Sequence, residues 1–221
     1  MKLLFNAVVK FLFGIALCLL LVFLPAGSFE YLNGWIFTAV LFLPMLVLGV
    51  VLFFKAPSLL EKRLESKEKR GAQKGITALC GIVFLLGFVV AGLDFRFEIT
   101  SVPLWCVVVA SVILLVSYTA YAEVMRENAY LSRTIEVKQD QKLVDSGLYG
   151  VVRHPMYLAT LFMFLAIPII LGSWLALVCF AFYPIFIVFR IIDEEKLLKA
   201  ELKGYTEYTQ KVKYRLIPFI W

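Results

Sequence analysis

Residues 156–189 read MYLATLFMFLAIPIILGSWLALVCFAFYPIFIVF, a 34-residue apolar run with a break near its middle. A helix crosses a hydrocarbon core of about 30 Å with around 20 mostly apolar residues, so this run is too long for a single crossing. Its middle holds Pro168 and Gly172-Ser173, and Pro and Gly interrupt helices where a chain bends. The run therefore predicts two membrane helices that turn back on each other as a tight hairpin.

Four further apolar runs precede this hairpin, and they lack the alternation of barrel strands. They are Ala7–Leu24, Trp35–Phe54, Gly75–Leu93 and Pro103–Ala122. Apolar residues make up 62% of the 221-residue chain, against about 45–50% in soluble domains. We therefore predict an all-α, polytopic transmembrane helical bundle with about six spans. The alternation of charged and apolar residues over Lys196–Trp221 predicts a C-terminal amphipathic interfacial helix.

The distribution of positive charge along the chain is consistent with an even number of spans. Lys and Arg are sparse in segments 25–34 and 94–102 and abundant in segments 55–74 and 123–155 and in the tail from Arg190. Positive residues collect in cytoplasmic loops of membrane proteins, so both termini and the charged loops are expected to face the cytoplasm. This topology accounts for the net charge of +6 without a nucleic-acid partner.

The chain shows no repeat and no soluble segment, so we expect residues 1–221 to form a single membrane domain. Within it, residues 1–122 are predicted to be a four-span scaffold. Residues 123–221 are predicted to hold a cofactor-binding loop, the helical hairpin and a catalytic tail. The compact size and the lack of a retention signal favour a multi-pass protein of a bacterial inner membrane.

Polar residues concentrate in two clusters of the C-terminal third. The first, residues 141–157, leads from a polar loop into the fifth span, and the second, residues 190–195, ends the sixth. Ionisable groups at a membrane edge are costly and usually mark function or pairing. Arg190 and Glu194 are four residues apart and share a helix face, so they can form an ion pair. A hairpin would bring both to His154 and Tyr157.

His154 is the only histidine of the chain. Alone it would be read as an interfacial hydrogen-bonding residue, but its surroundings favour the lip of a site for a small polar cofactor. Gly147 and Gly150 allow close backbone approach, and Pro155 can open a helix whose first N–H groups are free to bind a polar ligand. A metal site is not expected, since no second His and no Cys pair lies nearby.

In their order and separation, these clusters resemble the isoprenylcysteine carboxyl methyltransferase family and the related phospholipid methyltransferases. The resemblance covers about Ser132 to Trp221. The matching residues are Gly147-Leu148-Tyr149, Arg153-His154-Pro155-Met156-Tyr157, Glu194-Glu195, Gly204-Tyr205, Tyr208 and Arg215-Leu216-Ile217-Pro218. The resemblance implies a helical membrane enzyme that binds S-adenosylmethionine at the cytoplasmic side while a lipophilic acceptor enters from the bilayer.

Site residues follow from the motif positions of this resemblance. Arg190 and Glu194 are the expected catalytic residues, and Arg190 is expected to position the acceptor. The expected cofactor-binding residues are Gln141, Lys142, Leu143, Val144, Tyr149, Arg153, His154, Tyr157, Glu194 and Glu195. No metal is expected, and the expected partners are the lipophilic methyl acceptor and membrane lipids.

The sequence leaves open whether the methylated group of the acceptor is a carboxylate or an amine. Arg190 can hold a carboxylate, such as that of a prenylated cysteine, without any general base. An amine acceptor must instead be deprotonated, which His154 or a carboxylate could do, so phospholipid or other amine N-methylation is the alternative.

The two alternatives to a methyltransferase are a non-enzymatic membrane protein, either a transporter or a partner-binding subunit, and a membrane reductase. A transporter is expected to place ionisable groups or broken helices near the bilayer midplane, whereas the charges here lie at the edges. A non-enzymatic partner-binding subunit would use the polar clusters structurally. A membrane reductase of the sterol type has similar C-terminal motifs but uses NADPH, and the short chain without an evident nucleotide-binding segment argues against it.

Overall fold

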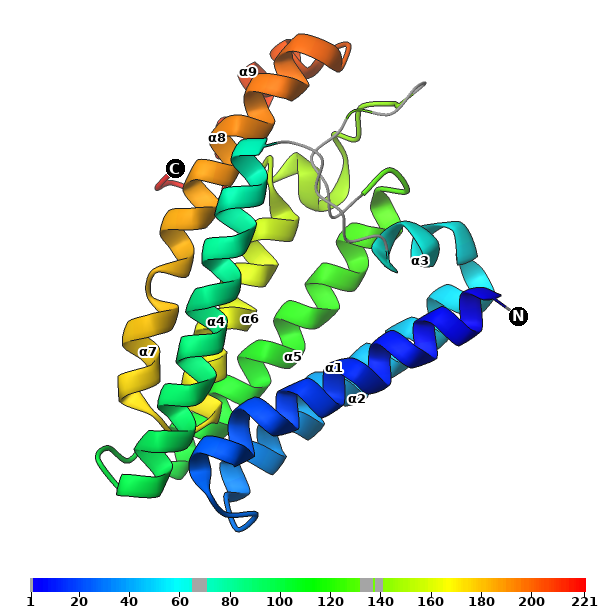
Figure 1. The fold of residues 1–221 in the computed structure, drawn as a ribbon. Helices are drawn as coiled ribbons and strands as arrows, with labels where there is room; N and C mark the ends of the chain where they lie inside the picture. Colours follow the sequence, from blue (N-terminus) through cyan, green and yellow to red (C-terminus); the bar gives the residue numbers. More distant parts are fainter. Residues whose placement is uncertain (1, 65–70, 132–136, 138–140) are drawn as a thin grey trace.

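The computed structural model describes residues 2–64, 71–131, 137 and 141–221, and over these it is helical, without strands (Figure 1). The elements are α1 (Lys2–Ala26), α2 (Leu32–Lys55), α3 (Pro57–Leu64), α4 (Gly71–Phe97), α5 (Leu104–Glu127), the 3₁₀ turn η1 (Gly147–Gly150), α6 (Pro155–Ile170), α7 (Trp174–Phe180), α8 (Tyr183–Glu201) and α9 (Tyr205–Lys211). The predicted all-α polytopic bundle is confirmed. The positive residues at 67, 69, 70, 133 and 138 and the predicted start of the resemblance at Ser132 lie outside the described residues.

Five helical stretches are long and apolar enough to cross a membrane. They are Lys2–Ala26, Leu32–Lys55, Gln73–Phe97, Leu104–Glu127 and Trp174–Glu201, the last of which joins α7 and α8. The sixth apolar helix, α6, has 16 residues and is about 24 Å long at 1.5 Å per residue. The protein is therefore an integral, multi-pass membrane protein.

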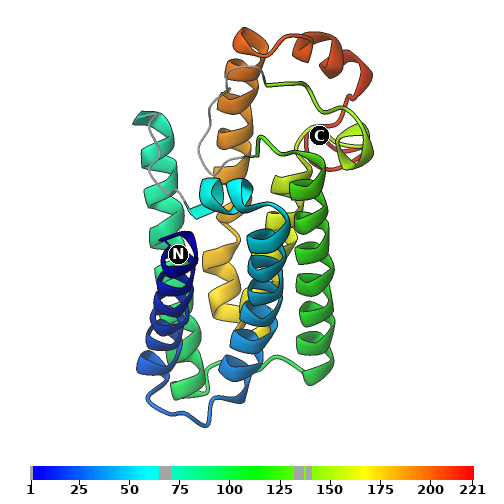
Figure 2. The ribbon, with the colours of Figure 1, turned by 90° about the vertical axis from the view of Figure 1, so that its right-hand side faces the viewer.

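The connections gather at two opposite ends of the bundle (Figure 2). The α1–α2, α4–α5 and α6–α7 connections lie together at the lower end, whereas α3, η1 and α9 lie toward the upper end. At the lower end Asp94, 1% exposed, accepts hydrogen bonds from the Thr100 amide at 2.7 Å and from the Ser173 hydroxyl. A buried carboxylate requires such donors. Asp94 therefore ties the α4–α5 connection to the α6–α7 turn.

The predicted hairpin is present, and Gly172 makes its turn. Gly172 has φ +79°, which glycine adopts without steric cost, and Ser173 then caps α7 by accepting a hydrogen bond from the Ala176 amide at 2.9 Å. Pro168, expected near the break, lies inside α6. A second interruption at residues 181–182, between α7 and α8, was not predicted.

The C-terminal tail is divided rather than one helix. α8 ends at Glu201, and Gly204, with φ +83°, reverses the chain before the short helix α9. Residues 212–221 then return as an irregular segment whose backbone pairs with the start of α6: the Arg153 and His154 amides donate to the Tyr214 and Arg215 carbonyls at 2.9 Å. The tail thus folds back over the start of α6.

Candidate functional site

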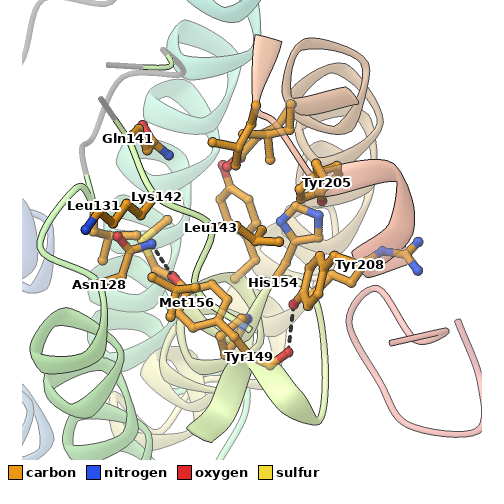
Figure 3. Close-up of a pocket in the computed structure, with 17 residues that line it drawn as sticks. Asn128, Leu131, Gln141, Lys142, Leu143, Tyr149, His154, Met156, Tyr205 and Tyr208 are labelled. Atoms are coloured by element: carbon orange, nitrogen blue, oxygen red, sulfur yellow. Dashed lines mark hydrogen bonds between the residues drawn. The ribbon is translucent and has the colours of Figure 1, made fainter. Parts of the chain in front are cut away.

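A cavity lies between the loop before η1, the start of α6 and the α8–α9 corner (Figure 3). It encloses about 560 Å³ of empty space, a volume that includes its open mouth. The lining residues are Asn128, Leu131, Gln141, Lys142, Leu143, Val144, Tyr149, Arg153, His154, Pro155, Met156, Tyr157, Glu194, Leu198, Leu202, Tyr205 and Tyr208.

Most of the residues predicted from the sequence meet at this cavity. Those that line it are Gln141, Lys142, Leu143, Val144, Tyr149, Arg153, His154, Tyr157 and Glu194. Arg190 and Glu195 are not among the lining residues. Each still contacts a lining side chain: Arg190 contacts Tyr157, and Glu195 contacts Arg153.

Tyr157 joins Arg190 to Glu194. Its hydroxyl donates to Glu194 Oε2 at 2.6 Å and accepts from Arg190 Nε at 2.9 Å, while Arg190 Nη1 reaches Thr77 Oγ1 on α4 at 3.3 Å. The predicted approach of Arg190 and Glu194 to Tyr157 is confirmed, whereas the side chain of His154 lies beside Glu195. A guanidinium and a carboxylate one helical turn apart are thereby held in fixed positions beside the cavity.

Glu195, 3% exposed, holds the C-terminal tail against α6. Its Oε1 accepts from Arg153 Nε at 2.6 Å and lies 3.4 Å from His154 Nε2, and its Oε2 accepts from Arg215 Nε at 2.9 Å. Arg153 also donates through Nη1 to the carbonyls of Val212 and Lys213. The first polar cluster, the second cluster and the tail are therefore joined by one buried network.

The turn η1 is positioned from the end of α5. Glu127 accepts hydrogen bonds from the Leu148 amide at 3.2 and 3.1 Å, and Asn128 Nδ2 donates to the Tyr149 hydroxyl at 3.0 Å. Gly147 has φ +56°, and a Cβ at this position would overlap the Glu127 carboxylate. Only glycine fits this approach, so the spacing between α5 and the lip of the cavity depends on it.

Replacing Gly147 with alanine is expected to destabilise the protein by about 1–3 kcal/mol, because the added Cβ combines backbone strain with displacement of Glu127. Melting temperature in detergent would measure the loss. Gly150→Ala is the matched control, since its Cβ would meet only the Asp145 carbonyl oxygen at 3.4 Å. Equal melting temperatures for the two variants would contradict this role of Gly147.

Three tyrosines from η1 and α9 form one side of the site. Burial is the main cause that raises the pKa of Tyr149, to about 12, and it also raises the pKa values of Tyr205 and Tyr208. These phenols therefore stay protonated and act as donors at neutral pH. Tyr208 donates to the Tyr149 carbonyl at 2.7 Å, which fastens α9 to η1.

Several lining residues were not predicted as site residues. Leu198 and Leu202 follow Glu194 at intervals of four, so helical periodicity alone placed them on the face of Glu194. Tyr205 and Tyr208 were noted only as matching positions of the tail. Asn128 and Leu131 carried no signal, since they reach the cavity only through the packing of α5 against α6.

The chain is similar to three kinds of known protein. Residues 101–203 match the family model of the phospholipid methyltransferases. The structure of the eukaryotic intramembrane Ras methyltransferase ICMT (isoprenylcysteine carboxyl methyltransferase) is similar at a TM-score of 0.55 and 18% identity, covering 100% of this chain and 88% of that one. Delta(14)-sterol reductase TM7SF2 of Mus musculus is 34% identical over 91 residues, 40% of this chain and 22% of the reductase. The chain thus spans about a fifth of that reductase.

The fold places this chain among multi-pass helical membrane proteins, and it is similar to the fold of the ICMT structure. Within that class, the segment from the start of α5 to the end of α8 is matched by the phospholipid methyltransferase family. The resemblance predicted from the motifs is confirmed. The matched segment also includes α5, most of which was predicted to belong to the scaffold.

Proposed function

We propose that this protein is an S-adenosylmethionine-dependent methyltransferase that acts on a lipophilic acceptor at the membrane. The observation that carries the proposal is the set formed by Arg190, Tyr157 and Glu194, which joins two charged groups beside a cavity at one end of an apolar bundle. The match to the phospholipid methyltransferase family over residues 101–203 supports it.

The lining fits the proposed methyl donor. Glu194 offers a carboxylate for an amino group, and the rings of Tyr149 and Tyr157 offer faces for adenine or a cationic sulfonium. The apolar side chains of Leu143 and Leu198 complete a mixed wall of the kind that binds small molecules. S-adenosylmethionine, when bound, supplies an activated methyl group. The chain's own task is then to hold both reactants close and aligned.

For the acceptor, we propose a carboxylate such as that of a prenylated cysteine. Arg190 supports this, because its guanidinium is held beside the cavity by Tyr157 and can pair with an anion. The family description keeps N-methylation of a phospholipid or another amine as the second candidate, with His154 or Glu194 accepting the proton. We also propose that the cavity and both termini face the cytoplasm of a bacterial cell and that the acceptor enters from the bilayer.

Binding of the methyl donor by Glu194 is tested by calorimetry on protein purified in detergent. Glu194→Ala is expected to weaken S-adenosylmethionine binding at least about tenfold, since a hydrogen bond to a charged group contributes about 1.5–3 kcal/mol. Glu201→Ala, an exposed carboxylate on the same helix, is the control. Unchanged binding by the Glu194 variant would count against the assignment of this cavity.

A thermal-shift screen separates the classes of protein. S-adenosylmethionine is expected to raise the melting temperature, whereas ATP and NADPH are not. Stabilisation by NADPH alone would favour the reductase relationship, and no stabilisation by any of the three would favour a non-enzymatic role. Mass spectrometry of lipid extracts after incubation with a labelled methyl donor would then distinguish a prenylated acid from an aminolipid as acceptor.

A further inference from the structure

Tyr205 carries a buried polar group that the fold leaves without a partner. Its side chain is 3% exposed and lines the cavity, yet its hydroxyl has no hydrogen-bond partner among the described residues. Tyr208, three residues further on and equally buried, donates to the Tyr149 carbonyl. Buried polar groups are nearly always paired in native proteins, so the unpaired hydroxyl of a residue that lines the cavity is a candidate contact for a ligand.

The fold holds Tyr205 at this position. Gly204, at φ +83°, turns the chain so that α9 faces the cavity, and the Tyr205 ring packs 5.6 Å from that of Tyr208. The surrounding apolar cluster includes Leu143, Leu198, Leu202 and Val212. Burial, together with the negative charges of Glu195 and Glu194, raises the pKa of Tyr205, so its hydroxyl acts as a donor.

The charges around this hydroxyl disfavour an anionic ligand group. Glu195 and Glu194 are the two charged groups that raise the pKa of this hydroxyl most, and both are carboxylates. The nearby cation, Arg153, already donates to Glu195 and to two carbonyls of the tail. A carboxylate placed here would be desolvated under the influence of two other carboxylates, whereas an uncharged acceptor would not incur that cost.

We propose that Tyr205 is a ligand-binding residue whose hydroxyl donates a hydrogen bond to an uncharged acceptor atom on the nucleoside part of the bound methyl donor. The apolar side chains and aromatic rings on either side of it suit the flat, uncharged adenosine portion, whose ribose hydroxyls and ring nitrogens are acceptors. The inference rests on the proposed function and extends it: α9 becomes part of the donor site in addition to closing it (Figure 3).

The test compares two ligands by calorimetry: S-adenosylhomocysteine, and 5′-methylthioadenosine, which lacks the amino-acid portion. Tyr205→Phe is expected to weaken both by a similar factor of about 5–10, the loss of one hydrogen bond. The melting temperature of its ligand-free form should be unchanged or raised, because an unpaired hydroxyl has been removed. Tyr208→Phe should instead lower the ligand-free melting temperature, since it breaks the bond to Tyr149.

The outcomes separate this inference from the proposed function. Wild-type protein that binds neither ligand would overturn the proposed function and this inference with it. Wild-type binding that Tyr205→Phe leaves intact would overturn only the role of Tyr205. Weakening confined to S-adenosylhomocysteine would overturn the nucleoside contact, because the hydroxyl would then meet the amino-acid portion.

Discussion

Replacing Arg190 with alanine is expected to lower the rate of methyl transfer about 100-fold while changing the affinity for S-adenosylmethionine little. Arg190 contacts the hydroxyl of Tyr157, which lines the cavity, and the hydroxyl of Thr77 on α4. Its loss leaves Tyr157 bonded to Glu194, so the proposed donor contacts persist. The acceptor, however, loses its cation, and a misplacement of about 1 Å can cost about 100-fold in rate.

The measurement is transfer of a labelled methyl group to a small prenylated cysteine acid and, in parallel, to phosphatidylethanolamine. Arg190→Lys keeps the charge but not the planar fork of the guanidinium, so it should recover only part of the rate. Full activity of the alanine variant on the prenylated acid would exclude Arg190 as the residue that positions a carboxylate. Activity of the wild-type protein on the aminolipid alone would exclude it as well.

Glu195→Ala is expected to destabilise the folded protein by about 3–5 kcal/mol, as is typical when one partner of a buried ion pair is removed. Arg153 would be left 8% exposed and without its carboxylate, and Arg215 would lose its link from the tail to α8. The tail should then detach from the start of α6. Donor binding should fall as a consequence, because Tyr205 and Tyr208 belong to that tail.

Melting in detergent and limited trypsin digestion measure this effect. Lys211 and Lys213 are exposed and lie within the tail, so cleavage there should accelerate in the Glu195 variant. Glu195→Gln keeps the shape but not the charge, and it should fall between wild type and alanine. Glu201→Ala again serves as the control. A tail as resistant as that of the wild type would show that other contacts hold it.

The part of the site that follows from local pattern was predictable. The length of the apolar run and the glycine at its middle required a hairpin, and the hairpin required Arg190 and Glu194 to approach Tyr157. Contacts between segments distant in the chain were not predictable in the same way. Arg215 reaches Glu195 only because Gly204 reverses the tail, and Asp94 is buried because Thr100 and Ser173 pack against its carboxylate.

The membrane bundle, its hairpin and the meeting of two polar clusters were determined by the sequence alone, because apolar length and turn residues act locally along the chain. Only the tertiary structure decided what the adjacent pair Glu194 and Glu195 does. Successive residues on a helix point about 100° apart, since one turn takes 3.6 residues. Glu194 therefore faces Tyr157 and the cavity, whereas Glu195 faces Arg153 and the returning tail.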